Sequence, residues 1–177
     1  MVTAFKNIKG RLKQKDMFCD VKIMIDSSEI YLKAIIDTGN FLKDPISKSP
    51  VIVVEKEALK GKVSEKILDN LEEIISNQNI DIGEYVPKIR LIPFSSLGKE
   101  NGILTGIKVD RIKISYDGRD IYNSNVIMGV YNGKLSKTDK YKSLIGLDLL
   151  EDKGGTSDEY LGTYKRQNND NTCQILK

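Results

Sequence analysis

Histidine is absent from this chain of 177 residues. Its absence excludes the Ser-His and Cys-His pairs of nucleophilic catalysis and removes the most common zinc ligand. The two cysteines, Cys19 and Cys173, have neither metal-ligand spacing nor a disulfide framework, so we interpret both as free structural thiols suited to a reducing cytosol. The remaining candidates for catalytic groups are therefore the carboxylates of Asp and Glu. The sequence predicts neither a cofactor nor a metal.

Long apolar runs and a strong charge are also missing. No run approaches the roughly 20 apolar residues that a membrane-spanning helix needs. A net charge of +3 is spread along the chain, which favours no nucleic-acid partner. Hydrophobic residues make up 40% of the chain and charged residues 30%, a balance typical of a globular protein. A chain of this length fits one domain with a buried core.

One motif stands out, Asp37-Thr38-Gly39 at the end of the apolar pair Ile35-Ile36. A given tripeptide occurs by chance about 0.03 times in a chain of this length, and an Asp in an ordinary strand-ending turn is the alternative. Water activation by aspartyl chemistry needs two carboxylates that share a proton. Because the motif occurs once, a two-fold homodimer supplies the second carboxylate most simply, as Asp37 of the partner subunit.

Apolar patterns predict strands on both sides of Asp37. Residues 19–25 alternate apolar and polar, residues 26–28 form a turn signal, and residues 30–36 return apolar, which predicts a β-hairpin. After the motif, two prolines break the chain, and residues 51–54 read as a short strand buried on both faces. Together they place the motif on a turn between strands.

Between residues 62 and 77 the apolar period changes to that of a helix. Ser64 is the expected N-cap, and Val63 is placed to pack on Leu68 as a hydrophobic staple. We expect this one added helix to serve packing.

The second half of the chain reads as further β structure. Residues 88–94 and 103–109 predict a hairpin whose tip carries Gly98 and Gly102, the expected hinges of a substrate-covering flap; an ordinary surface hairpin is the alternative. Farther along, Asp117-Gly118 is a type I′ turn signal between short strands. Several short strands at close spacing indicate a β-barrel or sandwich.

A second segment completes a recognisable pattern. The Asp37 motif followed by Leu144-Ile145-Gly146-Leu147-Asp148-Leu149-Leu150 is similar to the single-motif, retropepsin-like aspartic proteases. Residues 36–51 and 90–104 resemble more closely the sporulation sigma-E factor processing peptidases of endospore-forming bacteria, and the resemblance covers about residues 21–150. It implies a mainly β fold, a retropepsin-like single-lobe aspartic protease β-barrel with one added helix.

The resemblance also implies roles for the motif residues. Asp37 is the catalytic carboxylate, Thr38 braces the turn against its counterpart, and Gly39 lets the backbone approach the carboxylate. In the homodimer the two Asp37 carboxylates would lie a few ångströms apart and hold one proton between them. One oxygen then activates water, and the other protonates the carbonyl of the substrate. Retroviral enzymes usually have Ala where Asn40 stands; its amide either hydrogen-bonds the carboxylate or serves the local turn. Asp148 is expected to cap or brace the helix after its glycine.

The activity implied is that of an aspartic endopeptidase, active as a homodimer. The resemblance implies that it removes the pro-sequence of the inactive sigma-E precursor, its protein substrate, in the mother cell, and that a signal protein from the forespore activates it. Family members carry an N-terminal bundle of membrane-spanning helices that this chain lacks. We therefore expect a soluble fragment of a protein of the mother-cell membrane at the sporulation septum, with the protease domain on the cytoplasmic side.

The expected organisation has three parts. Residues 1–18 form a basic lead-in or juxtamembrane linker, residues 19–155 the retropepsin-like protease domain, and residues 156–177 a polar C-terminal tail. An alternative function from another class is a non-catalytic β-barrel module for dimerisation or peptide binding that retains the Asp-Thr-Gly motif.

Overall fold

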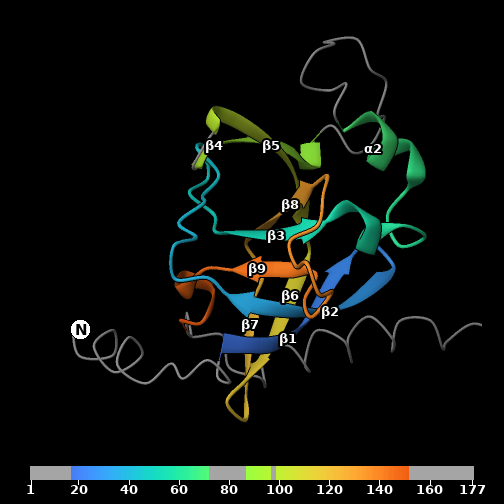
Figure 1. Ribbon diagram of the computed structural model, residues 1–177. Coiled ribbons are helices and arrows are strands. Elements are labelled where there is room, and N and C mark those ends of the chain that lie inside the picture. Colours follow the sequence, from blue (N-terminus) through green and yellow to red (C-terminus); the bar gives the residue numbers. More distant parts are fainter. Residues whose placement is uncertain (1–16, 72–86, 97–98, 152–177) are drawn as a thin grey trace, which may run out of the picture.

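A single nine-stranded β-sheet dominates the computed structural model of this chain (Figure 1). The structure describes residues 17–71, 87–96 and 99–151. The strands are β1 (Phe18–Ile25), β2 (Ser28–Ile36), β3 (Val51–Glu55), β4 (Ile89–Ser96), β5 (Lys99–Val109), β6 (Arg111–Tyr116), β7 (Arg119–Asn123), β8 (Val126–Tyr131) and β9 (Ser143–Ile145). Their order across the sheet is β4-β5-β8-β3-β9-β2-β1-β6-β7.

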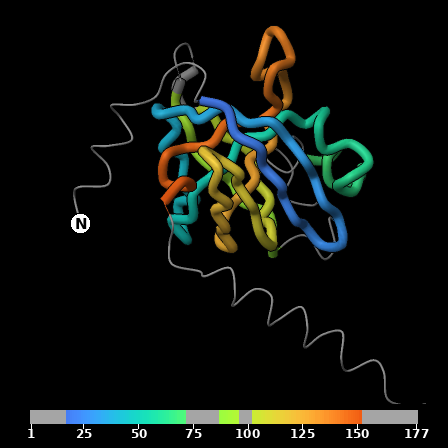
Figure 2. The backbone as a smooth tube through the Cα atoms, turned by 90° about the horizontal axis from the view of Figure 1, so that it is seen from below, coloured from blue at the N-terminus to red at the C-terminus, as the bar shows by residue number. Residues whose placement is uncertain are grey.

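The predicted mainly β class with an added helix is confirmed. The sheet wraps around an interior without closing, because β4 and β7 remain as its two edges within the described part of the chain (Figure 2). The predicted barrel is therefore an open, strongly curved sheet.

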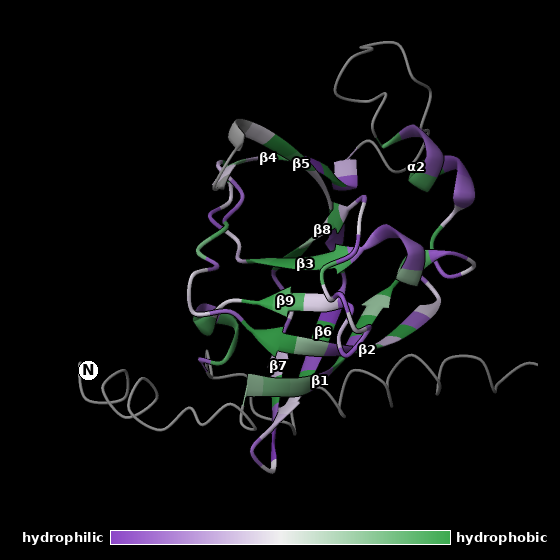
Figure 3. Ribbon diagram, viewed as in Figure 1, coloured by the Kyte–Doolittle hydropathy of each residue, from purple (hydrophilic) through white to green (hydrophobic). Residues whose placement is uncertain are grey.

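Alternation of apolar and polar residues builds the main core. In β1, Val21, Ile23 and Ile25 are buried, and β1 pairs antiparallel with β2, as the sequence predicts. All five residues of β3 are buried, which confirms the short strand expected over 51–54. Hydrophobic residues are concentrated on β3, β9 and β2 at the middle of the sheet (Figure 3).

Two parallel pairings bring distant segments together. β3 lies between β8, with which it is parallel, and β9, with which it is antiparallel. β9 in turn runs parallel to β2, so that Ile36 faces Ile145 in the register. Because the two strands point the same way, the chain after Ile36 and the chain after Ile145 leave the sheet side by side. This places the Asp37 motif next to Gly146.

Outside the sheet, the described part of the chain includes the short helical segments η2 (Lys56–Leu59), α2 (Glu65–Asn70) and η4 (Leu147–Leu149). Ser64 is the N-cap of α2 as expected, without a side-chain capping hydrogen bond, and Val63 and Leu68 both belong to the main core. The remainder of the predicted helix, residues 72–77, lies outside the described residues. In residues 17–71, 87–96 and 99–151 no helix is long and apolar enough to cross a membrane.

The second predicted hairpin is formed by β4 and β5, which pair antiparallel. Gly98 at its tip lies outside the described residues. Gly102 is paired with Phe94 inside the hairpin, and a Cβ at Gly102 would lie 2.5 Å from the ring of Phe94. The structure therefore gives Gly102 a packing role, and its action as a flap hinge stays a prediction.

Candidate active site

Asp37 follows directly after the last residue of β2. Its backbone N–H donates to the carbonyl of Ile145 at 2.8 Å, so the pairing of β2 with β9 continues into the motif. The side chain is half-buried, and its Oδ1 accepts the N–H of Gly39 at 2.9 Å. The N–H of Asn40 donates to the Asp37 carbonyl at 3.1 Å. Hydrogen bonds at both ends of this turn therefore fix the position of the Asp37 carboxylate.

Thr38 and Gly39 occupy the exposed part of this turn. A Cβ at Gly39 would lie 3.3 Å from Oδ1 of Asp37, closer than most side chains tolerate. The backbone at Gly39 therefore lies close to the carboxylate, and the supporting role expected for Gly39 stays a prediction. The Thr38 side chain is exposed, and its bracing role stays a prediction.

Asn40 is nearly buried, with 9% of its surface exposed. Its Nδ2 donates to the carbonyl of Val51 at 3.4 Å, and its Oδ1 accepts the N–H of Leu42 at 3.2 Å. Both bonds join the motif to the start of β3. They support the local turn role for Asn40 rather than a bond to the carboxylate.

Gly146 packs directly against the motif. A Cβ at this position would lie well inside van der Waals distance of the carbonyl oxygen of Asn40, so any side chain must displace the backbone of the turn. Beyond it, Asp148 forms an ion pair with Lys43 at 2.8 Å, which raises the pKa of Lys43. Asp148 therefore braces its short helix η4 against the segment that follows Asp37. The glycine therefore allows the Leu-Ile-Gly segment to pack against the Asp37 motif.

Replacement of Gly146 by Ala should lower the free energy of unfolding by about 2 kcal/mol, because the added methyl group overpacks the contact with Asn40. Urea unfolding measures the change. Gly61→Ala is a matched control: its Cβ meets nothing within 4 Å, but its φ of +69° costs about 1 kcal/mol. Equal stability losses in the two variants would contradict the close contact.

Two buried carboxylates, Asp44 and Glu55, were missed by the sequence analysis, and each is 1% exposed. Burial alone would raise the pKa of Asp44, but hydrogen bonds from Ser47 and Ile46 and the charge of Arg90 outweigh it and lower the pKa. The available sequence signal was Asp44 followed by Pro and Ser47, a pattern typical of an Asx-type turn.

Glu55 ends β3 and anchors the segment 132–142, which projects from the sheet as the orange loop in Figure 2. Its Oε1 accepts the N–H of Leu135 at 2.7 Å, and its Oε2 lies 2.9 Å from Nζ of Lys142. Burial opposes ionisation, but Lys142 and the backbone donors outweigh it and lower the pKa of Glu55. This charged pair attaches the base of the loop to the sheet.

Acid should therefore destabilise the fold. A carboxyl group whose pKa is lower in the folded than in the unfolded chain stabilises the fold above the unfolded value, and this contribution is lost as pH falls through the folded value. For Asp44 and Glu55 the loss should begin near their ordinary pKa values of 3.8 and 4.5 and continue at lower pH. Urea unfolding between pH 7 and pH 2 measures it. In Asp44→Asn the free energy of unfolding should fall less steeply as the pH is lowered. In Asp69→Asn, a change at an exposed position, it should fall as in the wild-type chain.

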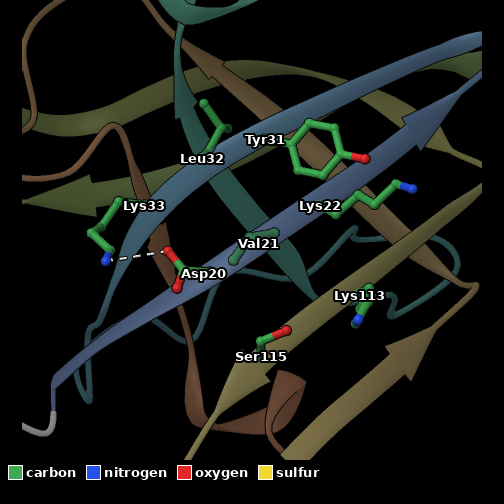
Figure 4. Close-up of a pocket in the computed structure, with 8 residues that line it drawn as sticks. All are labelled: Asp20, Val21, Lys22, Tyr31, Leu32, Lys33, Lys113 and Ser115. Carbon is green, nitrogen blue, oxygen red and sulfur yellow. Dashed lines mark ion pairs between the residues drawn. The ribbon is translucent and has the colours of Figure 1, made fainter.

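A separate pocket lies on β1, β2 and β6 (Figure 4). It does not include Asp37, and its lysines already face carboxylates. Lys33 lies 3.2 Å from Asp20, and the other two pairs are Lys22 with Glu29 at 2.6 Å and Lys113 with Asp120 at 2.8 Å. Because these charges are neutralised, we assign no ligand to this pocket. In the described ranges, no three His, Cys, Asp or Glu side chains gather as a metal site.

Fold and site together define the class of the protein. A curved, mainly β sheet carries an Asp-Thr-Gly turn at the end of a central strand, and Gly146 packs behind that turn. This is the layout of an aspartic protease-like domain. The sequence profile of the family described as sporulation factor SpoIIGA matches residues 1–149, and the chain belongs to that family.

Individual relatives agree with this assignment. The chain is 29% identical over 138 residues to the sporulation sigma-E factor-processing peptidase of Priestia megaterium, covering 76% of this chain and 45% of the relative. It is 30% identical over 138 residues to a putative sporulation sigma factor-processing peptidase of Bacillus thuringiensis subsp. kurstaki, covering 76% of this chain and 85% of the relative. It is 26% identical over 152 residues to the sporulation sigma-E factor-processing peptidase of Bacillus subtilis strain 168, covering 84% of this chain and 49% of the relative.

The resemblance recognised from residues 36–51 and 90–104 is thus confirmed at the level of the family. The chain spans about half the length of the relatives from Priestia megaterium and Bacillus subtilis. No solved structure matches the chain.

Proposed function

We propose that this chain is an aspartic endopeptidase that processes an inactive sigma-factor precursor during sporulation, and that it acts as a homodimer. The observation that carries the proposal is the Asp37 turn, in which a half-buried carboxylate is oriented by Gly39 at the end of a buried strand. The relatives named as sigma-E factor-processing peptidases support the choice of substrate.

In this proposal the active site is completed by Asp37 of the partner subunit. Two carboxylates a few ångströms apart share one proton, because ionising both is costly. The ionised member removes a proton from water as the water attacks the scissile carbonyl, and the protonated member donates to the carbonyl oxygen. The N–H of Gly39 orients one oxygen of each carboxylate throughout. Thr38 braces the two turns against each other.

Assembly is then the step at which activity is controlled. Asp37 cannot act alone, so any device that brings two chains together switches the enzyme on. We propose that attachment to the mother-cell membrane and a signal protein from the forespore bring the chains together by raising their local concentration. The β4–β5 hairpin, with Gly98 and Gly102, covers the bound precursor.

Co-expression with the precursor tests the proposal. The wild-type chain should yield a shortened precursor, and Asp37→Asn should leave the precursor at full length. Asp69→Asn, a change of the same chemistry at an exposed position of α2, is the matched control and should cleave normally. Normal cleavage by Asp37→Asn would overturn the proposal.

A further inference from the structure

The segment between β2 and β3 contains a tightly closed loop, residues 42–50, here called the Asp44 loop. In Figure 1 this cyan segment rises from the end of β2 toward β4 and β5 before it returns to β3. The N–H of Asp44 donates to the carbonyl of Ser49 at 2.9 Å, and the N–H of Lys48 donates to the carbonyl of Asp44 at 2.9 Å. The N–H of Val51 closes the base of the loop by donating to the Leu42 carbonyl at 3.1 Å.

The carboxylate of Asp44 fills the centre of this loop. Its Oδ2 accepts the Oγ–H of Ser47 at 2.5 Å and the N–H of Ser47 at 3.1 Å, and its Oδ1 accepts the N–H of Ile46 at 3.5 Å. The opposite charge comes from outside the loop: Nε of Arg90, on β4, lies 3.6 Å from Oδ2. A carboxylate that is 1% exposed needs such a partner, because an unpaired buried charge is costly.

Arg90 is itself fixed to the beginning of its strand. Its Nη1 donates to the carbonyls of Pro87 and Ile89, both at 2.7 Å. β4 is an edge strand that pairs with β5 alone in the described sheet, so the ion pair with Asp44 adds a second attachment for the β4–β5 hairpin. The hairpin is thereby held to the segment that follows Asp37.

The Asp44 loop is also joined to the Asp37 turn. The base of the loop ends at Val51, whose carbonyl accepts the side-chain amide of Asn40 at 3.4 Å, and the backbone of Asn40 closes the turn on Asp37. A continuous set of contacts therefore runs from Arg90 through Asp44 and Asn40 to Asp37.

We infer that Asp44 and Arg90 are positioning residues that hold the β4–β5 hairpin at a fixed distance from the Asp37 turn. Neither touches the reacting atoms. Their consequence for catalysis rests on the proposed function: a substrate bound between hairpin and turn is held less well when the pair is broken, so KM rises while the chemical step is retained.

A fluorescent reporter tests the attachment without any activity. The chain has no tryptophan, so Ile46→Trp, at a position 85% exposed, introduces a single reporter into the Asp44 loop. Time-resolved anisotropy of that tryptophan measures nanosecond motion of the loop. Arg90→Gln in this background should raise the amplitude of the fast decay about twofold. Arg90→Lys should restore much of the rigidity, because a point charge suffices for a single contact.

Arg119→Gln is the matched control, because Arg119 is exposed on β7, the opposite edge of the sheet. It should leave the anisotropy unchanged. Asp44→Asn, which keeps the shape of the side chain but removes its charge, provides a second variant if Arg90→Gln does not fold. Equal anisotropy in the reporter chain and in its Arg90→Gln or Asp44→Asn variant would overturn the inference.

Kinetics of precursor cleavage supply the second readout. Arg90→Gln should raise KM about fivefold and change kcat less than about twofold, and Arg90→Lys should recover most of the loss. A purely structural role would lower the midpoint of thermal unfolding and leave KM of the folded enzyme unchanged. If neither the wild-type chain nor Asp37→Asn cleaves the precursor, the proposed function fails, and the anisotropy still decides the inference.

Discussion

Replacement of Asp37 by Asn is expected to lower precursor cleavage by roughly a thousandfold, the middle of the range for removing a general acid–base group. The amide that replaces each carboxyl group can neither take a proton from water nor pass one to the carbonyl at neutral pH. A dimer of two such subunits therefore lacks both members of the acid–base pair. The rate of cleavage of purified precursor, with the wild-type chain as reference, measures the loss.

The same variant should fold normally. Asn retains an oxygen at the position of Oδ1, so the hydrogen bond from the N–H of Gly39 at 2.9 Å has an acceptor in both chains. The half-buried side chain leaves no cavity, and the free energy of unfolding should change by less than about 1 kcal/mol. A folded Asp37→Asn chain that cleaves at the wild-type rate would contradict the catalytic role of Asp37. Absence of cleavage by both folded chains, wild-type and Asp37→Asn, would instead favour a module that binds peptides without cleaving them.

An excess of Asp37→Asn subunits is expected to inhibit the wild-type chain. With random pairing and three variant subunits for each wild-type subunit, about one quarter of the wild-type subunits meet a wild-type partner. Activity per wild-type subunit should therefore fall to about one quarter, because a mixed dimer carries a single Asp37. Precursor cleavage at a constant amount of wild-type chain and an increasing amount of variant measures this decline.

Adding Asp69→Asn subunits in the same amounts is the control. These subunits carry an intact Asp37 and should raise total activity in proportion to their number. If Asp37→Asn subunits leave the wild-type activity unchanged, the chain works as a monomer or uses a different second carboxylate.

Local patterns were sufficient to predict much of the sheet. Alternation predicted the β1–β2 hairpin, and the run of β-branched residues in 51–54 predicted a fully buried strand. The Asp117-Gly118 signal is confirmed by positive φ angles of 49° and 71° at the turn between β6 and β7. Such features depend on neighbours in the sequence, which a single sequence displays.

Contacts between distant segments could not be predicted in the same way. The parallel pairings of β2 with β9 and of β3 with β8 join strands that lie far apart along the chain, and no local pattern encodes them. The same holds for Asp44 in the loop between β2 and β3, whose partner Arg90 lies on β4. An acidic residue that begins a polar turn is usually exposed, so the burial of this carboxylate became visible only in the fold.

For the site itself, the Asp-Thr-Gly motif indicated the position of the carboxylate, and the family resemblance indicated its chemistry. The structure adds that Asn40 bonds to Val51 and Leu42, and that Gly146 allows the close approach of the Asn40 carbonyl. The motif is therefore supported from two sides, by β3 and by β9.

The most direct test of the account is the distance between the two Asp37 carboxylates in an active assembly, measured in a crystal structure with a bound precursor peptide. We expect the nearest oxygens to lie about 3 Å apart across a two-fold axis, as in a pair that shares one proton. A separation too large for a single bridging water, more than about 6 Å, or a different carboxylate facing Asp37, would contradict it.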